Sequence, residues 1–152
     1  MNIIEQVKQI LADCPLVSDL MGATNEIRID FTEDNPVSFG LYPTGDQLTK
    51  ENILGNQDRR HNFVLYAVFQ SFTDYDRLAN STFLLNLAYY LEHAATGQEI
   101  EVTIDNKTVL GKLTKLSSAN GMLYGYQDGT LSGPVTYQIQ IYADYYIESE
   151  GL

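Results

Sequence analysis

The sequence predicts an α+β domain: an antiparallel sheet with a short N-terminal helix and one long helix packed on one face. Two patterns and the length of the chain predict it. Residues 135–147 alternate between apolar and polar side chains, as a half-buried strand does. Residues 84–95 place apolar side chains three and four positions apart, as an amphipathic helix does. The 152 residues contain no linker or low-complexity tract, so we expect a single domain.

The chain is expected to open with a short helix. Its apolar residues recur at helical spacing, and they are Ile3, Ile4, Val7, Ile10 and Leu11. Cys14 precedes Pro15, and a residue before proline avoids the helical conformation. The helix should therefore end near Asp13, with Cys14 as a small buried residue.

Several strands are expected between the two helices. Alternating side chains predict strands over residues 27–31 and 37–41. The turn-forming residues 43–46 should stop the second of these strands. A weaker pattern over residues 47–54 predicts an edge strand. Residues 63–69 are apolar on both faces, which predicts a strand at the centre of the sheet.

The long helix should follow the cap signal Thr73-Asp74 and stop at Gly97. One side of it carries an apolar stripe for the core, formed by Leu84, Leu87, Ala88, Leu91 and Ala95. A second apolar stripe, on another side of the helix, consists of Leu78, Leu85 and Tyr89. This second stripe either packs on the N-terminal helix or contacts a neighbouring subunit, because periodicity does not identify the partner.

The remaining residues predict further strands. Residues 100–104 alternate, and Asp105-Asn106 can turn the chain back. Leucines recur every three positions from 110 to 116, and we interpret this stretch as a strand as well. Turn dipeptides such as Asn120-Gly121 predict a flexible loop or an extended hairpin near residues 119–134.

Composition argues against several classes of protein. A net charge of −11 disfavours a nucleic-acid reader that works through a broad basic face. The single cysteine, Cys14, excludes an internal disulfide framework and a cysteine-rich zinc site. No apolar run approaches the roughly 18 residues of a membrane span, and Glu5 interrupts the apolar core that a signal peptide needs. We therefore expect no membrane partner, and a cytoplasmic protein unless it is packaged into a particle.

Residues with chemical potential have simpler explanations. The carboxylates of Asp74-Tyr75-Asp76 suit capping of a helix N-terminus. His61 and His93 fall on different predicted elements and lack the spacing of a metal site. Cys14 has no neighbours in the sequence that would activate a thiolate. We expect no enzymatic activity, no metal and no cofactor.

Five short segments, taken in order, resemble a known family. They are the Tyr42-Pro43-Thr44-Gly45 turn, the entry from Gly55 to Phe63 into a central strand, the helix from Leu84 to Leu91, Leu116-Ser117-Ser118 with Gly121 and Leu123-Tyr124, and the closing Tyr137-Gln138-Ile139-Gln140-Ile141 strand. Their order and spacing, over roughly residues 36 to 147, resemble the minor capsid or tail terminator proteins of Gram-positive tailed phages and prophages. The sequence departs from that pattern at Gly55-Asn56 and by an insertion near 127–133.

The resemblance implies a structural virion protein that forms a ring, often hexameric, which caps the tail tube and joins it to the head. It implies as partners further copies of the chain, the tail tube protein and a head-completion or connector protein. It also implies location in the virion tail, with assembly in the host cytoplasm, and neither catalysis nor a cofactor.

The residues themselves suggest where such a subunit would make contacts. The candidate oligomer interface comprises Arg59, Arg60, Leu78, Leu85 and Tyr89, and the candidate tail-contact loop comprises Tyr124, Tyr126, Gln127 and Asp128. The two arginines offer fork-shaped donors on an acidic chain, and the loop residues follow turn-forming glycines. Two other classes stay open: a small-ligand-binding protein or enzyme with a site in a sheet cavity, and a cytoplasmic regulatory module that dimerises through the second helix stripe.

Overall fold

A computed structural model describes residues 1–21, 26–30, 32, 38–71, 74–95, 97–126 and 133–148. The helices in these ranges are α1 (Ile3–Asp13), α2 (Pro15–Met21) and α3 (Asp74–Ala94). The strands are β1 (Arg28–Ile29), β2 (Ser38–Glu51), β3 (Gln57–Ser71), β4 (Glu99–Ile104), β5 (Lys107–Tyr126) and β6 (Gly133–Ile147). Strands hold 56% of the described residues, so the sheet dominates the molecule more than the predicted balance of helix and strand implies.

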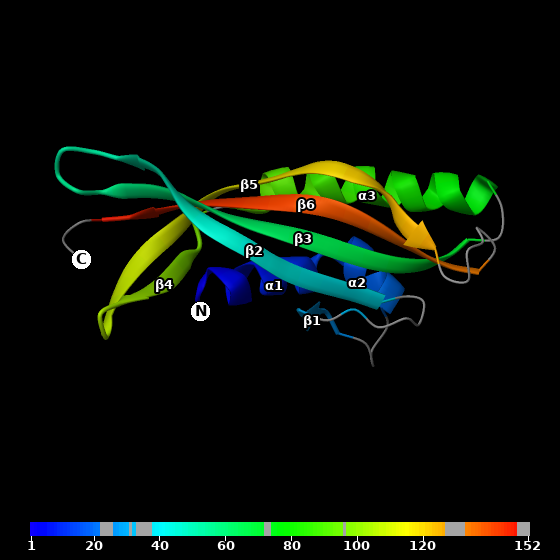
Figure 1. The fold of residues 1–152 in the computed structure, drawn as a ribbon, viewed down its shortest axis with the longest axis horizontal. Helices are drawn as coiled ribbons and strands as arrows, with labels where there is room; N and C mark the ends of the chain where they lie inside the picture. The colour runs from blue at the N-terminus through cyan, green and yellow to red at the C-terminus, as the bar shows by residue number, and fades with distance from the viewer. Residues whose placement is uncertain are drawn as a thin grey trace.

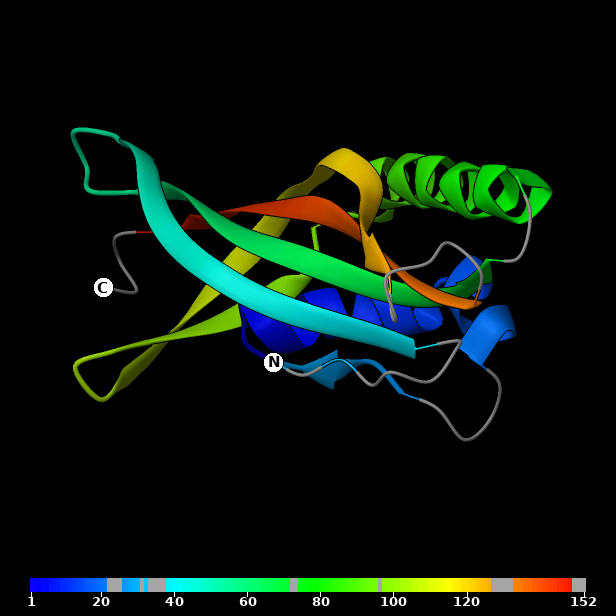
Figure 2. The same cartoon turned by 45° about the vertical axis from the view of Figure 1, so that its right-hand side comes forward.

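The six strands form one sheet in the order β1-β2-β3-β6-β5-β4, curled into a half-barrel (Figures 1 and 2). Four of its neighbouring pairs are antiparallel, but β1 runs parallel to β2, with Arg28 opposite Gly40 and Ile29 opposite Leu41. The sheet is therefore mixed, and the prediction of a purely antiparallel sheet was wrong. Alternation of side chains reports which face a residue occupies and carries no information about the direction of the neighbouring strand.

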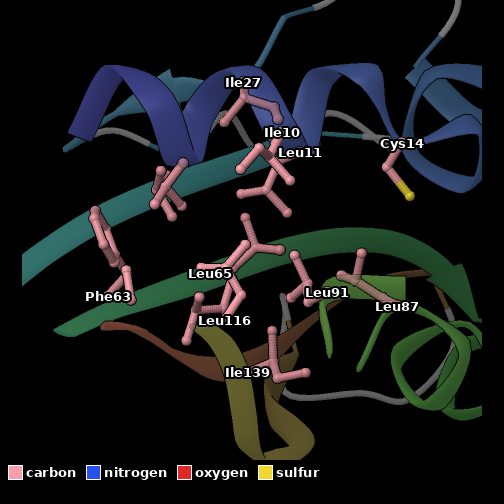
Figure 3. Packing of buried hydrophobic residues seen from close by; sticks show 14 of the residues in the cluster. Ile10, Leu11, Cys14, Ile27, Phe63, Leu65, Leu87, Leu91, Leu116 and Ile139 are labelled. Atoms are coloured by element: carbon pink, nitrogen blue, oxygen red, sulfur yellow. The ribbon is translucent and has the colours of Figure 1, made fainter. Parts of the chain in front are cut away.

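A single apolar cluster joins the helices to one face of the sheet (Figure 3). α1 contributes Ile10 and Leu11, α3 contributes Leu87 and Leu91, and the strands contribute residues such as Leu65. In β6 the buried residues are Val135, Tyr137, Ile139, Ile141, Ala143, Tyr145 and Ile147. The alternation predicted for residues 135–147 is thus confirmed. The central position of residues 63–69 is also confirmed, because β3 pairs with β2 on one side and β6 on the other.

Helix boundaries follow local chemistry. α1 begins at an N-cap, Asn2, whose side chain accepts a hydrogen bond from the Glu5 amide at 2.9 Å, and it ends at Asp13 as predicted. Cys14 is fully buried, also as predicted. Pro15 then opens a second short helix, α2, since a fixed φ and a missing amide suit the first helical position. Gly97 follows α3 with a φ of +84°, a conformation that favours glycine.

β2 does not stop at residues 43–46, contrary to the prediction. It continues to Glu51, with a break in register between Pro43 and Gly45. Beyond Leu41 no described strand pairs with the outer side of β2, and proline is tolerated on an edge strand. The edge strand predicted over residues 47–54 is therefore the distal part of β2, and its last residues form a turn instead.

β5 explains the leucines that recur every three positions. A register shift between Leu113 and Lys115 inserts an extra residue, so that Leu113 and Leu116 are both buried, whereas Leu110 is exposed. The turn before β5 places Asp105 and Asn106 at positive φ, as a tight hairpin turn requires. β5 extends to Tyr126, so residues 119–126 belong to a strand that pairs with β6, and residues 127–132 lie outside the described part of the chain.

Candidate interaction surfaces

The second stripe of the long helix is exposed. Leu78, Leu85 and Tyr89 are 65%, 51% and 54% exposed, and we call these three residues the outer stripe. At about 100° per residue they lie on the side of α3 opposite Leu87, which is fully buried. α1 therefore does not cover the outer stripe. Of the two alternatives that the sequence left open, packing on the N-terminal helix is wrong.

Arg59 and Arg60 point to opposite faces of the sheet, as neighbours on a strand do. Arg59 Nε donates to Asp46 Oδ1 at 2.7 Å. Arg60 donates from Nε and Nη2 to the two carboxylate oxygens of Asp144, at 2.7 and 3.1 Å. Both guanidinium groups are thus paired within the chain. Both belong to β3 near the β2–β3 turn, whereas α3, which carries the outer stripe, begins at the other end of the molecule, so the five candidate interface residues do not form one patch (Figure 1).

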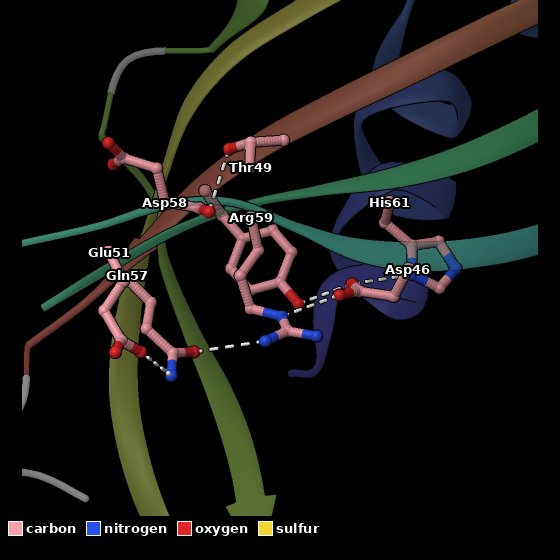
Figure 4. Close-up of polar contacts among 8 residues, drawn as sticks. Asp46, Thr49, Glu51, Gln57, Asp58, Arg59 and His61 are labelled. Atoms are coloured by element: carbon pink, nitrogen blue, oxygen red, sulfur yellow. Dashed lines mark hydrogen bonds and ion pairs between the residues drawn. The ribbon is translucent and has the colours of Figure 1, made fainter. Parts of the chain in front are cut away.

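A polar network binds β2, β3 and β6 together near the end of the sheet where the β2–β3 turn lies (Figure 4). We call residues 46–60, the distal part of the β2–β3 hairpin, the arm. Asp46 accepts hydrogen bonds from Arg59 and, at 2.5 Å, from the Tyr145 hydroxyl of β6. Its second oxygen also lies 3.1 Å from His61 Nδ1. The sequence does not reveal this network, because it depends on the registers that place Asp46 opposite His61 and Arg59 opposite Tyr145.

Asp46 is charged in this network. Burial alone would raise the pKa of Asp46, but hydrogen bonds from Tyr145, Arg59 and His61 outweigh burial and lower that pKa. Burial and the bond to Asp46 raise the pKa of Tyr145, which keeps its hydroxyl protonated as a donor. The Asp46 bond likewise raises the pKa of Arg59. The network therefore holds the base of the arm through a charged acceptor, Asp46, and two protonated donors, Tyr145 and Arg59.

Acid should weaken this network. Because the pKa of Asp46 is lower in the folded state, its contribution is fully present above the unfolded value and is lost as pH falls through the folded value. We expect Asp46→Asn to reduce stability at pH 7 by roughly 1–2 kcal/mol, with the difference from the unmodified chain shrinking below about pH 4. Urea unfolding between pH 7 and 3 measures this difference in the free energy of unfolding. Asp58→Asn, which changes an exposed carboxylate on the same arm, is the control. A difference that stays constant with pH would show that the charge of Asp46 is not what matters.

The sheet face opposite the core carries tyrosines. The ring centroids of Tyr42 and Tyr66 lie 5.2 Å apart, and those of Tyr66 and Tyr124 lie 5.0 Å apart. They border an open hollow of about 440 Å³, lined by Thr32, Tyr42, Thr44, Val64, Tyr66, Val68, Tyr124 and Thr136. Tyr124, predicted in a tail-contact loop, is an exposed residue of strand β5 instead. Tyr126 ends that strand, and Gln127 and Asp128 lie outside the described residues.

The tip of the arm exposes two apolar side chains, for which the sequence pattern predicts an edge strand. Ile53 is 101% exposed and Leu54 is 73% exposed. The Asn52 side chain accepts hydrogen bonds from the amides of Leu54 and Asn56, at 2.9 and 3.0 Å, and folds the tip into a turn. The turn residues Asn52 and Gly55-Asn56 were visible in the sequence and could have identified this tip.

The residues with chemical potential remain apart. Burial raises the pKa of the Cys14 thiol, which disfavours a reactive thiolate. His61 belongs to the Asp46 network, and His93 Nδ1 lies 2.8 Å from the carbonyl oxygen of Tyr89. Among the residues that the structure describes, no three histidine, cysteine or acidic side chains cluster as a metal site would need. None of the described helices combines the length and the apolar character needed to cross a bilayer.

Comparisons with known proteins do not identify a family for the chain. No protein-family model and no curated protein matches the chain. Among solved structures, a chain of the virion of a native gene transfer agent particle matches 94% of this chain and 92% of its own length. The TM-score is 0.47 and the sequence identity is 16%. A likeness at this level assigns the chain neither a family nor a function.

Proposed function

We propose that the chain is a structural virion protein of a tailed phage or prophage, which assembles into a ring at the head-proximal end of the tail. The observation that carries the proposal is the outer stripe. Leu78, Leu85 and Tyr89 lie in one row on the side of α3 that faces away from the core, where a monomer gains nothing from apolar side chains. The resemblance of the sequence segments to tail terminator proteins adds the specific role.

The charge of the chain limits how copies can meet. Each copy carries −11, so copies repel one another unless their contacting surfaces are uncharged or the charge is screened. The outer stripe supplies such a surface. Association should therefore strengthen as salt rises, because screening weakens the repulsion and leaves apolar contacts intact. An acidic ring also suits the passage of DNA, since like charge deters the phosphate backbone from adhering.

The surface formed by Tyr42, Tyr66 and Tyr124, which we call the tyrosine face, is the one that we assign to the tail tube and to the head-completion or connector protein. Tyrosine is enriched at protein interfaces because it combines a large apolar ring with a hydroxyl group. Tyr124 is exposed at the margin of this face and lies two residues before the end of β5. Contacts through this face would leave the outer stripe free for neighbouring copies.

Capping of purified tail tubes tests the proposed function. The unmodified chain should bind at one end of each tube, seen by negative-stain electron microscopy, and should stop further addition of tube subunits. Tyr124→Ala should reduce the fraction of capped ends several-fold. Tyr146→Ala is the matched control and should cap normally, because Tyr146 lies opposite Asp58 near the end of β6, far along that strand from Gln138, which is opposite Tyr66. Tubes that bind none of the unmodified chain would refute the assignment to the tail.

One observation favours a second candidate function. The hollow of about 440 Å³ beside Tyr42, Tyr66 and Tyr124 has the size of a small-ligand site. A ligand that raises the melting temperature of the unmodified chain, but not that of a Tyr66→Ala variant, would support a small-molecule binding protein. The dimeric regulatory module predicts pairs of chains and no larger species, so the mass of the assembly separates it from the ring.

A further inference from the structure

We infer that the tip of the arm of one copy docks into a groove between α2 and α3 of the next copy. The inference rests on the proposed function, because it specifies how copies of the chain associate. The groove has a volume of about 390 Å³ and is lined by Leu16, Leu78, Ala79, Thr82, Phe83 and Asn86. We call it the α2–α3 groove.

The tip is a preformed apolar projection. Ile53 and Leu54 lie in the turn between β2 and β3, beyond the last paired residues Glu51 and Gln57, and hydrogen bonds to the Asn52 side chain hold the turn. The Asp46 network ties the base of the arm to β6 through Tyr145. Because the arm is ordered before it binds, docking costs little conformational entropy.

The α2–α3 groove is a matching apolar surface. Its floor includes Phe83, whose ring packs against Phe39 and Phe69 at centroid distances of 5.9 and 5.4 Å, so the floor is anchored in the core. Leu16 also packs against the core cluster, and Leu78 of the outer stripe forms an exposed wall. The tyrosine hollow on the other face is lined by several hydroxyl groups and suits an isoleucine and a leucine less well.

A second copy is the occupant that the geometry selects. The β2–β3 turn lies at one end of the molecule, and α2 and the start of α3, which line the groove, lie at the other end in both views (Figures 1 and 2). The 15 residues of β3 alone extend over roughly 45 Å at about 3.3 Å per residue, so a tip cannot reach the groove of its own chain. Residues 52–56 and the residues that line the groove are all uncharged, which lets two copies of charge −11 touch there. Tip-to-groove contacts join unlike surfaces, and such contacts close into a ring when the rotation between copies allows it.

Directed cross-linking tests the contact. One copy carries Leu54→Cys at the tip, and a second, distinguishable by a mass tag, carries Thr82→Cys in the groove. After mixing and mild oxidation, a non-reducing gel should show the mixed cross-linked pair, and neither copy alone should cross-link above background. The native Cys14 is fully buried and present in every copy, so the unmodified chain provides the background. Leu54→Cys mixed with Leu110→Cys, an exposed site on β5, is the control pair and should stay uncross-linked.

A double variant provides a second readout. Ile53→Ser with Leu54→Ser should weaken self-association roughly 10- to 100-fold, as the loss of buried apolar side chains does, without lowering the melting temperature of the monomer. Cross-linking of Leu54→Cys copies to themselves at the mixed-pair yield, or unchanged association of the double variant, would overturn the tip-to-groove contact. A ring that forms without this cross-link would overturn the inference and leave the proposed function standing. A chain that stays monomeric would overturn both.

Discussion

Ile139→Asp is expected to abolish cooperative folding. Ile139 is buried in β6, opposite Leu65 of β3, and belongs to the cluster that joins the sheet to α3. An unpaired carboxylate there costs several kcal/mol, which is comparable to the whole stability of roughly 5–15 kcal/mol expected of a single domain. Circular dichroism during thermal and urea unfolding should show no cooperative transition. Tyr137→Asp, on the same face, should behave alike.

Gln138→Asp is the matched control for this substitution. Its side chain lies between those of Tyr137 and Ile139 along β6, on the opposite face, and is only half-buried. This variant should unfold cooperatively with a melting temperature close to that of the unmodified chain. An Ile139→Asp protein that is soluble, cooperative and nearly as stable as the control would mean that the buried face of β6 has been assigned wrongly.

Leu85→Glu should dissociate the ring while leaving the monomer folded. Leu85 is in the middle of the outer stripe and about half exposed, so a glutamate there meets water in the monomer. In the ring the same carboxylate would lose its hydration against another acidic copy, and we expect association to weaken by about 100-fold or more. Sedimentation velocity over a range of concentrations measures the change.

Leu110→Glu is the control for the outer stripe, because it makes the same chemical change at an exposed leucine on β5. It adds the same charge and should associate nearly as the unmodified chain does. Equal weakening by both variants would indicate general charge repulsion and no specific interface. A large fall in the melting temperature of monomeric Leu85→Glu would indicate that Leu85 supports the fold itself.

The parts of the fold that the sequence predicted are those determined by neighbouring residues. The end of α1 follows from the Cys14-Pro15 pair, and the buried face of β6 follows from strict alternation between 135 and 147. The core stripe of α3 follows from helical spacing, which also separated it from Leu85 and Tyr89. In each case the signal lies within one element, where periodicity maps directly onto a face.

The parts that the sequence missed depend on contacts between distant segments. The parallel pairing of β1 with β2 and the continuation of β2 past Pro43 are properties of the sheet and have no local signature. The Asp46 network needs β2, β3 and β6 in one register, with Asp46 and Tyr145 separated by 99 positions. Arg59 and Arg60 looked available for a partner because their carboxylates, Asp46 and Asp144, come from other strands.

The mass of the assembled particle tests ring formation most directly. Native mass spectrometry of the unmodified chain, over a range of protein and salt concentrations and with purified tail tubes, separates monomer, dimer and ring. Ring formation predicts one closed species of fixed stoichiometry, a hexamer if the resemblance to tail terminators holds, whose share rises with protein concentration and with salt. A chain that stays monomeric at every concentration, alone and with tail tubes, would contradict it.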